Sequence, residues 1–218
     1  MEELSISKHT IVDWANFCRE VTFDHMILKK TKIGGESVEV EIDESKFGKR
    51  KYHRGHHVEG QWIFGGIERG TNRCFLVPVE KRDKETLLQI IKDWILPNTT
   101  IISDCWKAYD CLNDEGYKHF KVNHSINFKD PDTNQHTNTI EGLWRHAKYS
   151  LPQYHKKKTF IAGYLSKFMF LKQCKALNVD PFTEFLRIAG SLYNPITAAY
   201  VDNDDNEGND DNEGDDDK

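Results

Sequence analysis

Three acidic residues, Asp43, Asp104 and Glu141, have the types and placement that metal-dependent cleavage of a phosphodiester requires. Asp43 lies in a strand-like run, Asp104 ends a second apolar run, and Glu141 falls in a helical pattern. Carboxylates from two neighbouring strand ends and one helix can hold a pair of Mg2+ or Mn2+ ions, which activate a water and stabilise the leaving oxygen. We therefore predict that these three residues are both the catalytic residues and the metal ligands.

The surroundings of Asp43 allow two interpretations. Alternation along the strand puts Val40 and Ile42 on one face, and Glu41 and Asp43 on the other. This pattern also fits a half-solvated strand whose acidic face meets water. The basic segment that follows favours the catalytic interpretation, because cations beside acidic metal ligands suit a phosphate backbone. We expect DNA contacts from its residues, although a solvated loop fits them as well: Lys49, Arg50, Lys51 and Arg54.

Asp104 also has a structural alternative. An Asp between an apolar strand and a following helix is often only a helix N-cap. The carboxyl ends of strands in α/β sheets are, however, also where ligands bind. The two roles are compatible, so the N-cap interpretation stays open beside the catalytic one.

Glu141 belongs to a polar stripe along its helix. Residues at i, i+3, i+7 and i+10 share one helix face, and here they are Asn138, Glu141, Arg145 and Lys148. The carboxylate of such a stripe can bind a metal ion, and the cations one and two turns later can bind the adjacent DNA phosphate. The alternative is an ordinary surface helix with spaced opposite charges. We predict DNA contacts from Asn138, Arg145 and Lys148, and a further site contact from His136, just before the helix.

The order of elements predicts the fold class. We expect strands over 38–47, 61–68, 73–79, 99–104 and 117–122, and helices over 87–95, 106–115, 138–148 and 159–177. Three antiparallel strands followed by alternating helices and strands indicate an α/β fold, a ribonuclease-H-like mixed five-stranded sheet flanked by helices. In this arrangement the first and fourth strands are neighbours, which would bring Asp43 and Asp104 together.

Composition divides the chain into three zones. Residues 201–218 hold eight Asp, two Glu and one Lys, a net charge of −9, so the other 200 residues carry +4 of the total −5. A mildly basic body is consistent with nucleic-acid binding. We predict a helical segment over 1–37, a catalytic domain over 38–195, and a disordered acidic tail over 196–218 that cannot bury enough apolar surface to fold.

The cysteines and the hydropathy of the chain indicate the cellular compartment. The five cysteines are scattered and form no C-x-x-C motif, which favours free thiols in a reducing compartment. No apolar stretch is long enough to span a bilayer, and the first residues lack a signal-peptide pattern. We expect no membrane association and no secretion: a nuclear protein in a eukaryote, a cytoplasmic one in a bacterium.

Several ordered motifs resemble those of Merlin-type transposases and their bacterial insertion-sequence relatives. The segments that carry the resemblance are 41–52 (EIDESKFGKRKY), 62–68 (WIFGGIE), 102–109 (ISDCWKAY), 122–125 (VNHS) and 136–145 (HTNTIEGLWR). The resemblance implies a DDE-type integrase-like catalytic domain that cuts and joins DNA with two divalent metal ions. It implies Asp43, Asp104 and Glu141 as the triad, with Asn138 as an alternative third ligand, and Lys148 as the basic residue that follows the third acid.

Departures from the family pattern leave a second function open. Full-length relatives carry a zinc ribbon ahead of the catalytic core, and this chain has no cysteine cluster. Residues 5–20 resemble only the last helix of a helix-turn-helix, so 1–37 is interpreted as the helical remnant of a DNA-binding region. We expect DNA, as transposon ends and target, to be the partner of a homo-oligomer. The alternative to a transposase is a domesticated or truncated DNA-binding module without catalytic activity.

Overall fold

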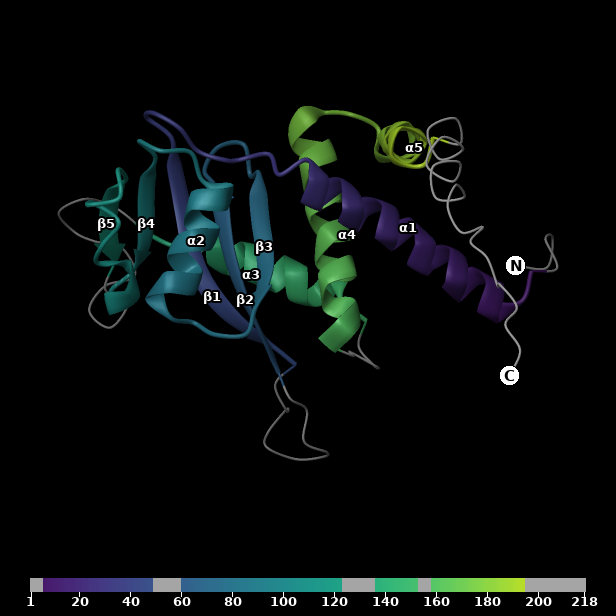
Figure 1. Ribbon diagram of the computed structural model, residues 1–218, viewed down its shortest axis with the longest axis horizontal. Helices are drawn as coiled ribbons and strands as arrows, with labels where there is room; N and C mark the ends of the chain where they lie inside the picture. The colour runs from purple at the N-terminus through teal and green to yellow at the C-terminus, as the bar shows by residue number, and fades with distance from the viewer. Residues whose placement is uncertain (1–5, 49–59, 123–135, 153–157, 195–218) are drawn as a thin grey trace, which may run out of the picture.

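The computed structural model describes residues 6–48, 60–122, 136–152 and 158–194. Its centre is a five-stranded sheet with the strand order β3-β2-β1-β4-β5 (Figure 1). The strands are β1 (Glu39–Phe47), β2 (Gln61–Glu68), β3 (Cys74–Val79), β4 (Thr100–Asp104) and β5 (Lys118–Val122). The β1–β2 and β2–β3 pairs are antiparallel, whereas β1–β4 and β4–β5 are parallel. This is the ribonuclease-H-like arrangement that the order of elements predicts.

The two faces of the sheet are covered by different helices. On one face lies α2 (Lys84–Trp94), where Trp94 stacks on Phe75 of β3 with ring centroids 5.5 Å apart. On the other face lies α3 (Asn138–Ser150), which packs against β1 and β2 (Figure 1). Successive strand residues point to opposite faces. The first half of β1 therefore presents its apolar residues to α2 and its acidic residues to α3.

A layer of three helices lies beside β3. It consists of α1 (Lys8–Leu28), α4 (Lys158–Leu177) and α5 (Pro181–Leu192) (Figure 1). α4 runs along β3, and the backbone N–H of Leu76 donates to Met169 Sδ of α4 at 3.0 Å. α1 and α5 then pack on α4 and on each other. The layer covers the edge strand, whose backbone groups would otherwise invite pairing with another chain.

α1 is the helix expected within residues 1–37. It begins after Ser7, whose side chain accepts a hydrogen bond from the Thr10 N–H at 3.1 Å. Only its second half carries buried residues. Its first half exposes four large apolar side chains: Ile11, Val12, Trp14 and Phe17. The assignment of residues 1–37 to a helix-turn-helix remnant stays a prediction.

The helix expected over 106–115 is wrong in type and length. This segment contains a short 3-10 helix, η2 (Lys107–Tyr109), followed by turns as far as Gly116, which has a φ of +83°. The side chains of Asp and Asn compete for backbone hydrogen bonds and favour turns over helix. Asn113 does so here, because its side chain accepts from the His119 N–H at 3.0 Å.

α5 is a helix that our sequence analysis did not predict. Its N-terminus carries recognisable signals: Asp180 accepts from the Thr183 N–H at 2.8 Å, and Pro181 occupies the first helical position. These two signals, rather than apolar periodicity, predict where the helix begins.

All five cysteines are free thiols, as expected, whereas the reducing compartment stays a prediction. Within the described ranges, no helix is both long enough and apolar enough to cross a membrane. The acidic tail over 196–218 lies outside the described residues.

Candidate active site

Asp43 and Asp104 occupy matching positions on neighbouring parallel strands. The last registered pair between β1 and β4 is Glu41 with Ile102, and each aspartate follows two residues later. Side chains two residues apart on a strand point to the same face of the sheet. The sheet therefore brings both carboxylates to one level, at the carboxyl end of β4.

α3 is held in register with β1 by three successive side-chain contacts. Glu41 accepts from the Ile140 N–H at 2.9 Å, Asp43 accepts from the Trp144 indole N–H at 2.9 Å, and Lys148 donates to Ser45 Oγ at 2.6 Å. The contacts recur every two residues on the strand and every four on the helix. Both intervals are about 6–7 Å long, so the two elements stay matched over two helical turns. This register sets where Glu141, one residue after Ile140, lies relative to Asp43.

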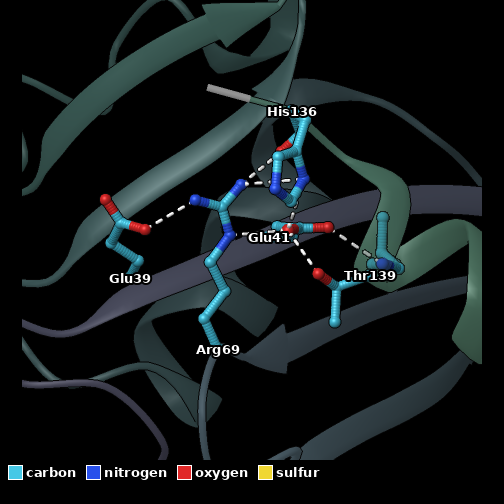
Figure 2. Close-up of polar contacts among 6 residues, drawn as sticks. Glu39, Glu41, Arg69, His136 and Thr139 are labelled. Carbon is cyan, nitrogen blue, oxygen red and sulfur yellow. Dashed lines mark hydrogen bonds and ion pairs between the residues drawn. The ribbon is translucent and has the colours of Figure 1, made fainter. Parts of the chain in front are cut away.

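Figure 2 shows the first contact, which is built around Glu41. The Glu41 side chain is 0% exposed. Its Oε1 accepts from Arg69 Nε and from Thr139 Oγ1, both at 2.7 Å, while Oε2 accepts from the Ile140 N–H. Arg69 also bonds Glu39 at 2.6 Å and the backbone oxygen of His136. Thr137, the N-cap residue of α3, makes no side-chain cap, so the carboxylate of Glu41 supplies one from another element.

The second contact depends on a glycine. Gly65 is the β2 partner of Asp43 in the strand register. A Cβ at this position would lie 2.7 Å from Trp144 Cη2 and 2.7 Å from Leu76 Cδ2. Because Gly65 has no side chain, the Trp144 ring can lie across β2 and point its N–H at Asp43.

Burial and neighbouring carboxylates perturb Asp43 at this end of the sheet. The pKa of Asp43 is raised to about 6, first by burial and further by the carboxylates of Asp104 and Glu141. The hydrogen bonds from the Trp144 indole and the Glu44 backbone act in the opposite direction. Both predicted partners therefore affect the pKa of Asp43, although they lie 61 and 98 positions further along the chain.

Glu44 is a fourth acid at the same end, and the sequence did not single it out. Burial, followed by the charges of Asp43 and Asp104, raises its pKa to about 8, while Arg82 lowers it. Its Oε1 is buried and has no hydrogen-bond partner among the described residues. Glu44 points to the α2 face, so the acidic group spans both faces of the sheet end.

The donor chemistry of this group fits a hard divalent cation. Carboxylate oxygens are the ligands that Mg2+ prefers, and a cation would stabilise the charged forms of Asp43 and Glu44, whose pKa values are raised by burial and by repulsion. In the part of the chain that the structure describes, however, no three His, Cys, Asp or Glu side chains are grouped closely enough to hold a metal ion as they stand. Asp43 is bonded to Trp144, and Asp104 Oδ1 accepts from the Trp106 N–H at 3.1 Å. Convergence of the three carboxylates on an ion stays a prediction.

The polar stripe of α3 has the expected orientation. Asn138, Glu141, Arg145 and Lys148 are all exposed, while Leu143, Trp144 and Ala147 are buried behind them. Lys148 also lies over the Phe47 ring, 5.3 Å from its centroid. His136 contacts the Arg69 guanidinium beside Glu41 (Figure 2). The predicted DNA contacts at Lys49, Arg50, Lys51 and Arg54 lie outside the described residues.

Two structural alternatives from the sequence can now be judged. The half-solvated strand is wrong for β1, because α3 covers its acidic face and Glu41 is fully buried. The N-cap alternative for Asp104 is wrong in detail, since η2 begins only after Trp106. Asp104 instead closes a turn through the Trp106 N–H, and this contact restrains its carboxylate.

The sequence reasoning missed the residues that support the site. Glu41 and Trp144 lie two and three residues from predicted catalytic acids, but their partners are about 100 residues away and carry no local signal. The one available signal was at Gly65 and Gly66, since glycine inside a strand indicates a close approach by another group.

Comparison with known proteins gives the chain's relatives. Residues 32–172, more than half of the chain, match the family model of the ISXO2-like transposase domain. An uncharacterized transposase-like protein of Haemophilus influenzae is 29% identical over 105 residues, which cover 47% of this chain and 78% of that protein.

Similar solved structures are retroviral integrase domains. The HTLV-2 integrase catalytic core domain in complex with magnesium aligns with 12% identity and a TM-score of 0.40, covering 63% of this chain and 86% of that one. The catalytic core domain of BIV integrase aligns with 14% identity and a TM-score of 0.43, covering 71% and 97%.

Replacing Glu41 should reveal how much stability the buried contact supplies. Glu41→Gln should lower the free energy of unfolding by about 3–5 kcal/mol, because Arg69 and the first turn of α3 lose a buried charge partner. The matched control is Glu39→Gln on the same strand, whose side chain bonds the same arginine but is 37% exposed. It should cost less than about 1 kcal/mol. Equal losses of unfolding free energy in the two variants, measured by urea denaturation, would contradict the assignment of Glu41 as the residue that anchors α3 to β1.

Adding a methyl group at Gly65 should disturb the Asp43–Trp144 contact. We expect Gly65→Ala to destabilise the protein by about 1–3 kcal/mol, because the buried Trp144 and Leu76 side chains must move. Gly190→Ala in α5 is the control: its Cβ would meet nothing within 4 Å, so it should stabilise by about 0.5–1 kcal/mol. Thermal and urea unfolding measure both, and a stabilised Gly65→Ala variant would show that Trp144 is not constrained there.

Proposed function

Because this chain belongs to the family of ISXO2-like transposase domains, we propose that it is a metal-dependent transposase that cuts and joins DNA. The observation that carries the proposal is the placement of Asp43 and Asp104 at matching positions of β1 and β4, with α3 registered against β1. Glu141, the proposed third acid, follows Ile140 on α3, and its charge contributes to the raised pKa of Asp43. The carboxyl end of the sheet is also where α/β folds bind ligands.

Asp43, Asp104 and Glu141 are proposed to hold one or two Mg2+ or Mn2+ ions. When bound, such ions would lower the pKa of a water and neutralise charge on the phosphate oxygens. The chain's own residues supply orientation. Trp144 fixes the Asp43 side chain, the Trp106 N–H fixes that of Asp104, and the Glu41 contact fixes the first turn of α3.

The proposed reaction has two steps that use the same carboxylates. In the first, water attacks a phosphodiester at the element end, and the P–O bond to the 3′ oxygen breaks to leave a free 3′ hydroxyl. In the second, that hydroxyl attacks a target phosphodiester, so one P–O bond forms as another breaks. Arg145, Lys148 and Asn138 lie on the same exposed stripe as Glu141 and are proposed to hold the phosphates beside it.

A non-catalytic DNA-binding module is the second candidate. The observation that favours it is that no three acids, histidines or cysteines in the described ranges are already grouped as a metal site. The two candidates make different predictions about metal binding and share the prediction of DNA binding. In either case we expect the chain to act as a homo-oligomer on DNA.

Metal binding separates these candidates without relying on activity. For the transposase, Mn2+ or Mg2+ at 100 times its Kd should stabilise the wild-type protein by about 2.7 kcal/mol. Asp104→Asn should lose this gain but still accept the Trp106 hydrogen bond, and its metal-free form should be no less stable because a repelling charge is gone. Asp93→Asn on α2 is the control and should keep the gain.

The same variants are then assayed for metal-dependent nicking and strand transfer on DNA that carries the element's ends. Asp43→Asn, Asp104→Asn and Glu141→Gln should each abolish product. If the wild-type protein gains no stability with either metal and makes no product, the non-catalytic candidate replaces the transposase.

DNA binding by the α3 stripe is tested at Lys148. Lys148→Gln should weaken binding to all sequences alike and reduce the slope of log affinity against log salt by about one. Ser45→Ala is the matched control, because it removes the hydrogen bond to Lys148 but leaves the charge. It should keep the wild-type slope. A loss confined to one DNA sequence would mean that Lys148 reads bases.

A further inference from the structure

A second group of cations lies on the opposite face of the acidic sheet end. The Arg82 guanidinium stacks on the Trp62 ring, 3.6 Å from its centroid, and lies 5.4 Å from the centroid of Trp106. Lys46 lies 5.7 Å from the Trp62 centroid. Lys46 and Trp62 are partners in the β1–β2 register, which places them on the α2 face with Glu44. We refer to Arg82, Trp62, Trp106 and Lys46 as the arginine clamp.

The clamp is continuous with the catalytic carboxylates. Trp106, one wall of the clamp, donates its backbone N–H to Asp104 at 3.1 Å. Arg82 is also close enough to Glu44 to influence the charge of that buried acid. A ligand that meets the Arg82 guanidinium would therefore lie next to any phosphodiester held at Asp104.

The geometry of Arg82 suits a phosphate. Among the described residues, no carboxylate lies within ion-pair distance of its guanidinium, and Arg82 is exposed. Stacking uses the flat face of the guanidinium and leaves its N–H edges available, and those edges match the oxygens of a phosphate in a two-point contact. The tryptophan also holds a long side chain in one orientation, which lowers the entropy lost on binding.

We propose that the arginine clamp binds a backbone phosphate of the DNA strand next to the phosphodiester that is cut. This assignment rests on the proposed function and adds a contact on the α2 face to those predicted on α3. Lys46 adds charge to the same phosphate region. Trp62 and Trp106 act as positioning residues, because they orient Arg82 and do not themselves carry charge.

A purely structural role for Arg82 makes a different prediction. If Arg82 served only to offset the Glu44 charge, its removal would change stability and leave the affinity for DNA unaltered. The clamp predicts the reverse order of effects: a large change in DNA binding with little change in the unfolding transition, because Arg82 is exposed.

The test is fluorescence polarisation with a short fluorescein-labelled DNA duplex, on the full chain, in EDTA so that nothing is cut. Arg82→Gln should weaken binding about tenfold, as expected for one lost charge-assisted hydrogen-bonded contact, and should reduce the salt slope by about 0.9 between about 50 and 200 mM salt. Arg82→Lys keeps the charge but loses the two-point hydrogen-bonding edge of the guanidinium. It should therefore have the wild-type salt slope but only part of the wild-type affinity for DNA.

Two further variants separate a clamp from diffuse attraction. Lys81→Gln removes an exposed cation of the same loop that stacks on no aromatic ring among the described residues, and it should change affinity less than about twofold. Trp62→Leu leaves the net charge unchanged but frees Arg82, and it should weaken binding if its unfolding transition shows a folded protein. Equal losses in Lys81→Gln and Arg82→Gln, or wild-type binding by Arg82→Gln, would overturn the clamp.

Failure of the proposed function gives a separate result. If the wild-type chain does not bind the duplex at all, the proposed function is overturned and the clamp with it. If the wild-type chain binds and Arg82→Gln binds equally well, only the clamp is overturned. A nicking defect at Asp104→Asn with normal duplex binding, together with weak binding by Arg82→Gln, supports both.

Discussion

The matched repeat of β1 and α3 is the constraint on which the candidate site depends. A strand advances by two residues over nearly the same length as a helix advances by four, so Glu41, Asp43 and Ser45 meet successive turns of α3. The repeat needs an anchor to fix its starting point. Glu41 supplies it, because a fully buried carboxylate tolerates only an arrangement in which both oxygens are satisfied. A shift of α3 by one residue would leave that charge without the Ile140 N–H and Thr139 hydroxyl.

Two kinds of acid therefore alternate with apolar residues along one strand. Glu41 is buried but paired with Arg69 and with a helix N-terminus, which together stabilise its charge. Asp43, two residues further on, accepts hydrogen bonds from the Trp144 indole and the Glu44 backbone, and its pKa is raised first by burial and further by two nearby carboxylates. The contrast distinguishes a structural acid, Glu41, from the proposed catalytic acid, Asp43, within the same alternating pattern. The hydrogen bond from Trp144 to Asp43 also explains why residue 65 is a glycine, because a side chain there would occupy the space that the Trp144 ring needs.

The sequence predicts the parts of this site that follow from element order. Strand and helix patterns were sufficient to place Asp43 beside Asp104 and to expose Glu141, Arg145 and Lys148 on one stripe. They could not predict Glu41, because an acid in an alternating strand has the same pattern whether water or a helix N-terminus covers it. The partners that decide this, Arg69 and Thr139, lie 28 and 98 positions away. The segment 106–115, expected as a helix, forms only the short η2 and turns, because its Asp and Asn side chains favour turns.

Cations that stack on aromatic rings lie on both faces of the sheet, on either side of the acidic end. Phe47 and Lys46 are adjacent on β1 and point to opposite faces. Lys148 lies over Phe47 on the α3 side, whereas Arg82 and Lys46 lie over Trp62 on the α2 side. An ion pair with a carboxylate would orient such side chains but would also neutralise them. A ring orients a cation at a cost of only part of its hydration, so the positive charge of Arg82 remains available to a phosphate. The aromatic residues of β1 and β2 thus let one short stretch of sheet concentrate acids at its end and keep cations on both sides of them.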